Sequence, residues 1–407
     1  MICAEDAASP ADVGDLTPGE AIQAALAHLC TRPDRLLPDT WLRTVAEAGE
    51  ADALAAAADR TMIAGLLWSA LTPGQRDLLP EAACELLRNH HIGNVLRWTM
   101  TRKLLIESAA SLSEAGIPAA PLKGAALLVT VYEDPGRRAL TDLDLLVPED
   151  ALEVAQKLLS KGAAQVHQPR AEHHHLGAII MPGAGGMIEL HGGDAHAALW
   201  PQRGDVFTSG RHITLEGSTF IVPDDVNLWL HTACHGLGHS PCYWPRMAAD
   251  LALLHRAADW SAERWEAVWQ AARERAMTST VAVAAAFANL GRIPAELREI
   301  AGRAIDRTAV EARAREAWGI ATTAETRKFG PWATSWVSRN EQRRRLIRQY
   351  LLPPPARLSE KIPVSETVAH ALYPCSIAFR CFELATTGLA WRLALRGRSF
   401  PEAVSGQ

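Results

Sequence analysis

Residues 140–147 read Leu-Thr-Asp-Leu-Asp-Leu-Leu-Val, and this stretch decides the fold that we expect. Its apolar part, residues 143–147, predicts a short buried strand. Successive side chains of a strand point to opposite faces, so Asp142 and Asp144 lie on one face and Leu143 and Leu145 on the other. Two carboxylates are therefore expected at one point of a sheet.

The segments around this strand predict a small mixed β-sheet with helices. Apolar runs bounded by glycine and proline are typical of strands, and helices commonly begin after proline or acidic residues. On these patterns we expect further strands at 117–122, 175–181 and 187–191, and helices at 125–132 and 151–160.

Two helical regions flank this sheet. Residues 18–110 carry alanine and leucine at helical spacings, and the same pattern returns from Pro223 onward. Asp224 or Asp225 is placed to cap the first helix of the second region, at 226–236. We therefore expect an α+β protein in three parts: a helical region at 1–110, an α/β core at 111–222 and a helical region at 223–407.

The bulk composition is that of a globular protein. Of the 407 residues, 48% are hydrophobic and 21% are charged, which allows a sizeable buried core. The net charge of -5 gives no overall positive field, so nucleic acid is not indicated as a partner. The seven cysteines form no Cys-x-x-Cys pair, so we expect reduced thiols rather than disulfides or a zinc knuckle.

The sequence predicts neither export nor a membrane span. Glu5, Asp6, Asp12 and Asp15 stand where a secretory signal has basic residues and then an apolar run. The alanine-rich runs are shorter than the ~20 apolar residues that cross a bilayer. We therefore expect a cytoplasmic protein without a membrane partner.

The acidic pair at Asp142 and Asp144 requires a neutralising cation. Like charges at close range repel, and carboxylate oxygens suit Mg²⁺ or Mn²⁺. Glu189 lies on a predicted strand that can pair with the first strand and point the same way. Three carboxylates can hold two cations, which activate an attacking hydroxyl and stabilise a departing pyrophosphate. These residues therefore predict a metal site for nucleotidyl transfer.

A phosphate-binding element is expected upstream of the acidic pair. Lys123 and Gly124 occupy the turn between a predicted strand and a predicted helix, where free backbone N–H groups can bind phosphate oxygens. Arg138 lies four residues before Asp142 and adds a fixed charge suited to phosphate. The order of glycine turn, helix, Asp-x-Asp and acidic strand is more specific than any single element.

With this order of motifs the chain resembles the uncharacterised bacterial nucleotidyltransferase-like proteins of the DNA polymerase β-type nucleotidyltransferase superfamily. The resemblance covers about residues 90 to 260. It is carried by the segments 121–126, 132–138, 142–147, 188–191, 231–239 and 246–250.

The resemblance implies a mixed-sheet catalytic core in which Asp142, Asp144 and Glu189 take the positions of the superfamily's metal carboxylates. It also implies Mg²⁺ or Mn²⁺ as cofactor and an NTP such as ATP as substrate. Gly124 falls near the phosphate-binding turn, which usually reads Gly-Ser or Gly-Gly, so here the charge of Lys123 replaces a hydroxyl. Some members are encoded beside peptide-modification genes, and we expect a peptide or a small molecule as acceptor.

Histidines predict further contacts, with alternatives that stay open. His231 and His235 lie one helical turn apart, which fits core histidines, a zinc site, or contacts to the nucleotide or the acceptor. In the last interpretation one of His231, His235 and Asp250 is a general base. His191 shares a strand face with Glu189 and fits a phosphate contact or a hydrogen bond to a metal ligand.

Other clusters are expected to be structural or solvated. Trp244, Trp260, Trp265 and Trp269 lie at helical spacings that are typical of a core. Arginines at 339, 343–345 and 348 are typical of a solvated helix face, with a phosphate or RNA site as the alternative, and the histidines at 173–175 are typical of adventitious metal binding.

We therefore predict an enzyme that transfers a nucleotidyl group from an NTP to an acceptor hydroxyl or phosphate, with metal held by the three carboxylates. Lys123, Gly124 and Arg138 are expected to bind the nucleotide. Two other hypotheses stay open. One is an NTP-binding regulatory or interaction protein on the same fold, which the missing turn hydroxyl favours, and the other is a zinc hydrolase built on the histidines.

Overall fold

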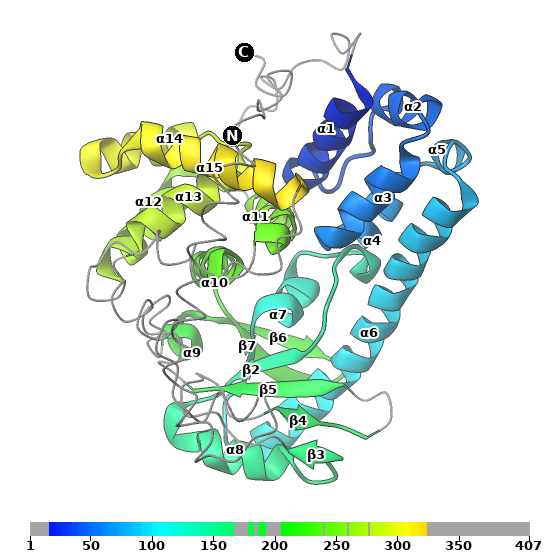
Figure 1. The fold of residues 1–407 in the computed structure, drawn as a ribbon. Helices are drawn as coiled ribbons and strands as arrows, with labels where there is room; N and C mark the ends of the chain where they lie inside the picture. The colour runs from blue at the N-terminus through cyan, green and yellow to red at the C-terminus, as the bar shows by residue number, and fades with distance from the viewer. Residues whose placement is uncertain are drawn as a thin grey trace, which may run out of the picture.

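The computed structural model describes residues 16–166, 178–182, 186–192, 205–238, 241–258, 260–275 and 277–323. Within these ranges the protein has the predicted α+β fold, with a five-stranded mixed sheet, a two-stranded hairpin and helical regions on either side of them in the chain (Figure 1). The histidines at 173–175 and the arginines between 339 and 348 lie outside the described residues.

The N-terminal region is a group of helices, as its helical spacings predict. Two of the helices begin with a capping box, in which Thr17 and Glu20, and again Thr72 and Gln75, exchange side-chain and backbone hydrogen bonds. A proline follows each cap, at a position where a helix uses no N–H donor. The helices are α1 (Pro18–Thr31), α2 (Asp39–Glu47), α3 (Ala51–Arg60), α4 (Ala64–Ala70), α5 (Pro73–Arg76) and α6 (Glu81–Glu114).

The five-stranded sheet has the order β1-β2-β5-β4-β3. Its central pair, β2 and β5, is parallel, and the other pairs are antiparallel. The strands are β1 (Ala120–Pro121), β2 (Leu143–Leu146), β3 (Gln165–Val166), β4 (Ile179–Ile180) and β5 (Met187–His191). The prediction for 187–191 is confirmed in full, and those for 117–122 and 143–147 are confirmed as shorter strands.

The two faces of the sheet pack into different hydrophobic clusters. Leu143 and Leu145 enter the main hydrophobic core, whereas Leu146 joins a smaller cluster with Ile221. Asp144 therefore shares its face with Leu146, and the predicted alternation is confirmed. The core on the side of Leu143 and Leu145 also contains residues of α6 and of α8 (Leu152–Leu159). The helices of this region are α7 (Lys123–Thr130), η2 (Pro135–Arg137), η3 (Glu149–Ala151) and α8 (Leu152–Leu159).

A β-hairpin that the sequence patterns did not predict lies beside the sheet. Its turn residues Glu216 and Gly217 both have positive φ angles, 49° and 86°, as a tight two-residue hairpin turn requires. The backbone N–H of Ile221 donates to the carbonyl of Ala119 at 3.0 Å, which joins the hairpin to the segment before β1. The elements are α9 (Asp205–Ser209), β6 (Arg211–Leu215) and β7 (Ser218–Val222).

The C-terminal part of the described chain is helical. Asp224 caps its first helix, because its Oδ1 accepts the backbone N–H of Asn227 at 2.9 Å. The helices and short turns are α10 (Asp225–Gly238), η4 (Pro241–Tyr243), α11 (Trp244–Ala257), α12 (Ala262–Glu274), α13 (Thr278–Ala288), α14 (Ala295–Ala301), η5 (Gly302–Ala304) and α15 (Arg307–Thr323). None of the helices in the described ranges is both long and apolar enough to cross a membrane.

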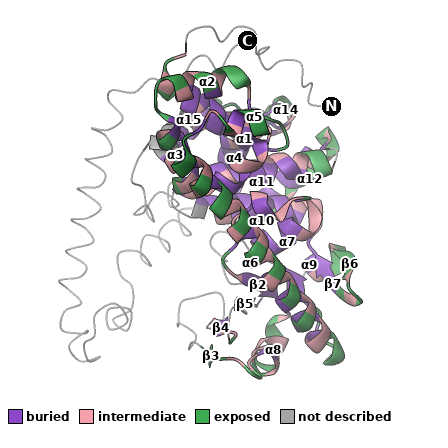
Figure 2. Ribbon diagram, turned by 90° about the vertical axis from the view of Figure 1, so that its right-hand side faces the viewer, coloured by how far each residue is buried: buried purple, intermediate pink, exposed green. Residues whose placement is uncertain are grey.

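One hydrophobic core continues through the three predicted regions. α1 packs against α11, and α10 and α11 are buried along most of their length (Figure 2). The boundary expected at 110 falls inside α6, and the boundary at 222 coincides with the end of β7. The division into 1–110, 111–222 and 223–407 stays a prediction.

An aromatic cluster between α10, α11 and α12 forms part of this core. Trp229 Nε1 donates to His255 Nε2 at 2.9 Å, and Trp260 and Trp265 pack around them. Burial lowers the pKa of His255 to about 3, so the imidazole is neutral and its Nε2 is free to accept. The four tryptophans predicted as core are all buried: Trp244, Trp260, Trp265 and Trp269.

We expect His255 to make the folding stability depend on pH. Its pKa is about 3 in the folded protein and about 6.5 in an unfolded chain, so between these values only the unfolded state binds the proton. The stability is therefore fully present above pH ~6.5 and falls as the pH drops toward 3, by at most about 1.4 kcal/mol per pH unit.

Urea denaturation of the wild type and of His255→Leu at several pH values measures this slope. The wild type should lose more stability per pH unit than His255→Leu. His212→Leu, at an exposed position of β6, is the control and should keep the wild-type slope. Equal slopes for wild type and His255→Leu contradict the prediction.

Candidate active site

The two acidic strands lie side by side, as expected from the sequence. β2 and β5 pair in parallel, with Asp144 opposite Glu189 and Leu146 opposite His191. Side chains at paired positions of adjacent strands project from the same face of a sheet. The register therefore brings Asp144, Glu189 and His191 to one face.

These three side chains form a compact group of possible metal ligands. Their ligand atoms all lie within 4.8 Å of one another. His191 Nε2 lies 2.7 Å from Asp144 Oδ1, and the ammonium of Lys123 donates to the same oxygen at 2.5 Å. Asp144 is thus the shared partner of an imidazole from β5 and a cation from α7.

The electrostatics of the group depend on Asp144, of which only 2% is exposed. Burial alone would raise the pKa of this carboxyl, but the charge of Lys123 and the hydrogen bond from His191 hold it well below its usual range. Burial also disfavours the ammonium of Lys123, yet Asp144, Glu189 and Asp142 raise its pKa above the ordinary value. The site therefore stabilises a positive charge at this point.

The donor set fits a divalent cation. Carboxylate oxygens suit Mg²⁺ and Mn²⁺, and the imidazole of His191 shifts the preference toward transition metals such as Mn²⁺. The ammonium of Lys123 stands against the same carboxylate that a metal ion would use. The buried negative charge of this group therefore requires a neighbouring cation, either the ammonium of Lys123 or a metal ion.

The turn that carries Lys123 is held in an unusual conformation. Lys123 is the first residue of α7 and has a φ of 48°, in the left-handed region that costs a non-glycine residue about 1–3 kcal/mol. The backbone N–H of Leu122 donates to the carbonyl of Asp144 at 3.0 Å and ties the turn to β2. At Gly124 a Cβ atom would overlap the guanidinium of Arg138, so glycine permits the close packing.

Asp142, the other half of the predicted pair, is not part of the compact group. It precedes β2, is partly buried, and accepts a hydrogen bond from the hydroxyl of Thr141 at 3.0 Å. Burial and the negative charge of Asp144 raise its pKa above the ordinary value. Asp142 therefore adds negative charge beside the group, while His191 occupies the third ligand position.

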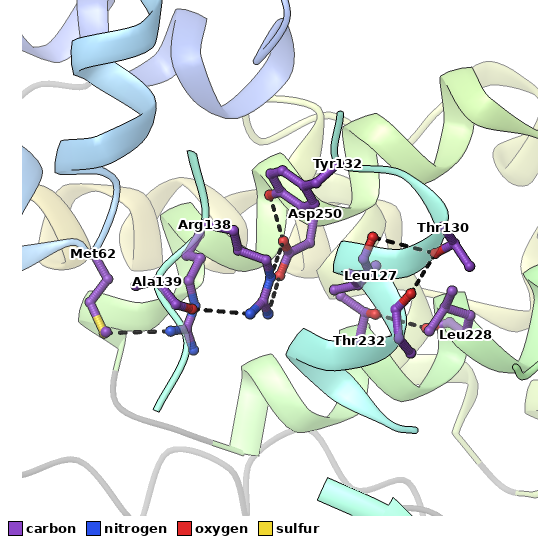
Figure 3. A network of polar contacts seen from close by, with 11 residues as sticks. Met62, Leu127, Thr130, Tyr132, Arg138, Ala139, Leu228, Thr232 and Asp250 are labelled. Carbon is purple, nitrogen blue, oxygen red and sulfur yellow. Dashed lines mark hydrogen bonds and ion pairs between the residues drawn. The ribbon is translucent and has the colours of Figure 1, made fainter. Parts of the chain in front are cut away.

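Arg138 and Asp250 bind each other. Arg138 Nε and Nη2 donate to the two oxygens of Asp250, both at 2.9 Å, and the hydroxyl of Tyr132 donates to Asp250 at 2.7 Å (Figure 3). Arg138 Nη1 donates to the carbonyl of Ala139 at 3.1 Å. The sequence predicts Arg138 as a phosphate contact and Asp250 as an acceptor or base residue, but here their charges compensate each other and fix the chain before β2.

The family profile described as uncharacterised nucleotidyltransferase matches residues 47–290. The chain belongs to this family. A comparison with curated proteins found no match. The matched range contains the ligand group, the Lys123 turn and the pair of Arg138 and Asp250, and family membership supports nucleotidyl transfer as the general activity.

The helical histidines of this nucleotidyltransferase-family protein lie on α10, next to α7. His231 is 4% exposed, and its ring centroid lies 6.0 Å from that of His235. Neither belongs to a group of three or more possible metal ligands within the described residues. Their predicted role toward the nucleotide or the acceptor stays a prediction.

One contact of this family member follows its sequence prediction and another does not. The expected hydrogen bond between His191 and a candidate metal ligand is present, at 2.7 Å from Asp144 Oδ1, and the spacing of two from Glu189 was the signal for a shared face. Tyr132 had no assigned role, although it opens one of the segments that carry the family resemblance. Its partner Asp250 is 118 residues away, so no local pattern links them.

Removing Asp250 should destabilise the protein strongly, because Arg138 would stay buried without a counter-charge. We expect Asp250→Ala to lower the free energy of unfolding by about 3–5 kcal/mol. Glu216→Ala, which removes the exposed partner of Arg102, is the matched control and should cost less than about 1 kcal/mol. Chemical denaturation followed by tryptophan fluorescence measures the free energy of unfolding of both variants. Equal decreases would contradict the prediction that the buried pair stabilises the protein more than the exposed pair.

Proposed function

We propose that this protein is a metal-dependent nucleotidyltransferase that moves a nucleotidyl group from an NTP to an acceptor hydroxyl or phosphate. The observation that carries the proposal is the convergence of Asp144, Glu189 and His191 beside the Lys123 turn. Family membership supports the class of reaction. A peptide or a small molecule is the proposed acceptor.

In this proposal Asp144, Glu189 and His191 hold Mg²⁺ or Mn²⁺, with Asp142 adding negative charge next to them. The ion, when bound, supplies charge for the phosphates and activates the attacking oxygen. The group lies on two paired strands, so its backbone positions are defined by the sheet register rather than by a loop.

The nucleotide is proposed to bind at the start of α7. The first N–H groups of a helix have no partner within the helix and suit phosphate oxygens, and Lys123 and Gly124 occupy this position. Arg138 and Asp250 position the chain that leads from α7 to β2. His231 and His235 are proposed for the acceptor side, where one of them accepts a proton from the attacking group.

Nucleotidyl transfer should be lost when Asp144 is replaced by a neutral residue, because the metal ion then loses one of its proposed carboxylate ligands. Labelled ATP, GTP, CTP and UTP, each with peptide, RNA and small-molecule acceptors, serve as substrates. We expect acceptor-dependent release of pyrophosphate by the wild type, loss with EDTA, and a decrease of at least about a hundredfold in Asp144→Asn. Glu216→Gln is the control and should keep wild-type activity.

The same assay distinguishes the enzyme from the alternative hypothesis. Activity that is unchanged in Asp142→Ala and Asp144→Asn would contradict the assignment of these residues to the active site. Tight binding of NTP with Mg²⁺, without pyrophosphate release for any acceptor, would replace the enzyme by a nucleotide-binding regulatory protein on the same fold.

Lys123→Met should make the protein depend on a divalent metal for stability. Without the ammonium, the buried carboxylate of Asp144 loses its main counter-charge. In EDTA the variant should therefore melt below the wild type, and Mg²⁺ or Mn²⁺ should raise its Tm more than that of the wild type. Lys103→Met, at an exposed position of α6, is the control, and equal metal-induced shifts in Lys123→Met and the wild type would contradict the prediction.

A further inference from the structure

Arg246 lies close to the candidate site but takes no part in the contacts described so far. It stands in the first turn of α11, one helical turn before Asp250, and residues four apart share a helix face. Asp250 on this face binds Arg138, whose guanidinium fills the space left at Gly124. Arg246 therefore lies on the side of α11 that faces the phosphate-binding turn.

The partners of Arg246 are weak for a guanidinium. Its Nη1 donates to the thioether of Met62 at 3.6 Å, and its Cζ lies 5.4 Å from the ring centroid of Tyr243. A thioether is a weak acceptor, and a guanidinium has five N–H donors. Within the described ranges no carboxylate forms an ion pair with Arg246, because Asp250 is engaged by Arg138 and Tyr132.

The charge of Arg246 acts on the site. Burial and the neighbouring charge of Arg138 lower its pKa to about 10, so the side chain remains a cation at neutral pH. The same charge lowers the pKa of Asp142, in opposition to burial and Asp144. Arg246 is half-buried, and a partly desolvated cation with so few acceptors is stabilised when an anion from outside the chain completes its hydrogen bonds.

We propose that Arg246 is the guanidinium that binds the polyphosphate of the nucleotide, an inference that rests on the proposed function. Guanidinium groups bind phosphate oxygens through two parallel N–H donors. Arg138 would have to break its pair with Asp250 to do so, and Lys123 is held by Asp144. Arg246 can donate to this ligand without breaking an ion pair to any residue in the described part of the chain.

Calorimetric titration with inorganic triphosphate and with ATP, both in excess Mg²⁺, tests this role. Arg246→Gln should weaken the binding of both by at least about tenfold, and Arg246→Lys should restore part of it. Arg256→Gln removes the same charge from the same helix, where Arg256 pairs with Asp34, and should bind both ligands like the wild type. Wild-type affinity in Arg246→Gln overturns the inference.

Thermal melts separate binding from a structural role. Because Arg246 forms no ion pair with the residues that the structure describes, Arg246→Gln should melt no lower than the wild type without ligand. It should also lose the rise in Tm that triphosphate gives to the wild type. A lower Tm together with unchanged triphosphate binding would make Arg246 a structural residue and overturn the inference.

The inference and the proposed function fail in different ways. Nucleotidyl transfer by the wild type, with triphosphate binding unchanged in Arg246→Gln, overturns the inference alone. Triphosphate binding that depends on Arg246, without pyrophosphate release for any acceptor, removes the proposed function and supports the polyphosphate site. Absence of ATP and triphosphate binding in the wild type overturns the inference.

Discussion

The contact between Lys123 and Asp144 is the interaction on which the geometry of the candidate site depends. Asp144 is buried at the centre of a parallel strand pair and needs a positive charge next to it. That charge comes from a lysine in a left-handed conformation at the start of α7, and the turn is held by a backbone hydrogen bond to the same aspartate. Gly124 follows because a side chain there would overlap Arg138. The buried carboxylate of Asp144 thus accounts for the turn and for the close approach of α7 to β2, and Arg138 accounts for the glycine.

A second buried pair connects this centre to the helices. Arg138 lies before β2 and Asp250 lies on α11, so their ion pair joins parts of the chain 112 residues apart. Tyr132, which lies just after α7, adds a hydrogen bond to Asp250. The helical region is therefore part of the framework of the candidate site, and α11 brings Arg246 to the side of the turn at Lys123. The family match also extends beyond the sheet and covers α11.

Local patterns predicted the elements better than their extents. The strand at 187–191 and the capped starts of the helices follow from side-chain alternation and from capping residues, which act over a few positions. The strand expected at 117–122 is only two residues long, because pairing with β2 sets its length. The hairpin of β6 and β7 was missed, although Glu216 and Gly217 make a tight turn. Its position depends on a hydrogen bond from Ile221 to Ala119, more than a hundred residues earlier.

Local sequence patterns were enough to predict that two acidic strands lie in a small mixed sheet, that Asp144 and Glu189 point to one face, and that a helix begins near Lys123 and Gly124. These features depend on the period of a strand and on turn chemistry, which are local. The packed fold was needed to show that His191 lies with Asp144 and Glu189 in the compact group of possible metal ligands, and that Arg138 pairs with Asp250. Several residues have suitable chemistry, and strand register and long-range ion pairs determine which of them come together. Both depend on the packed fold.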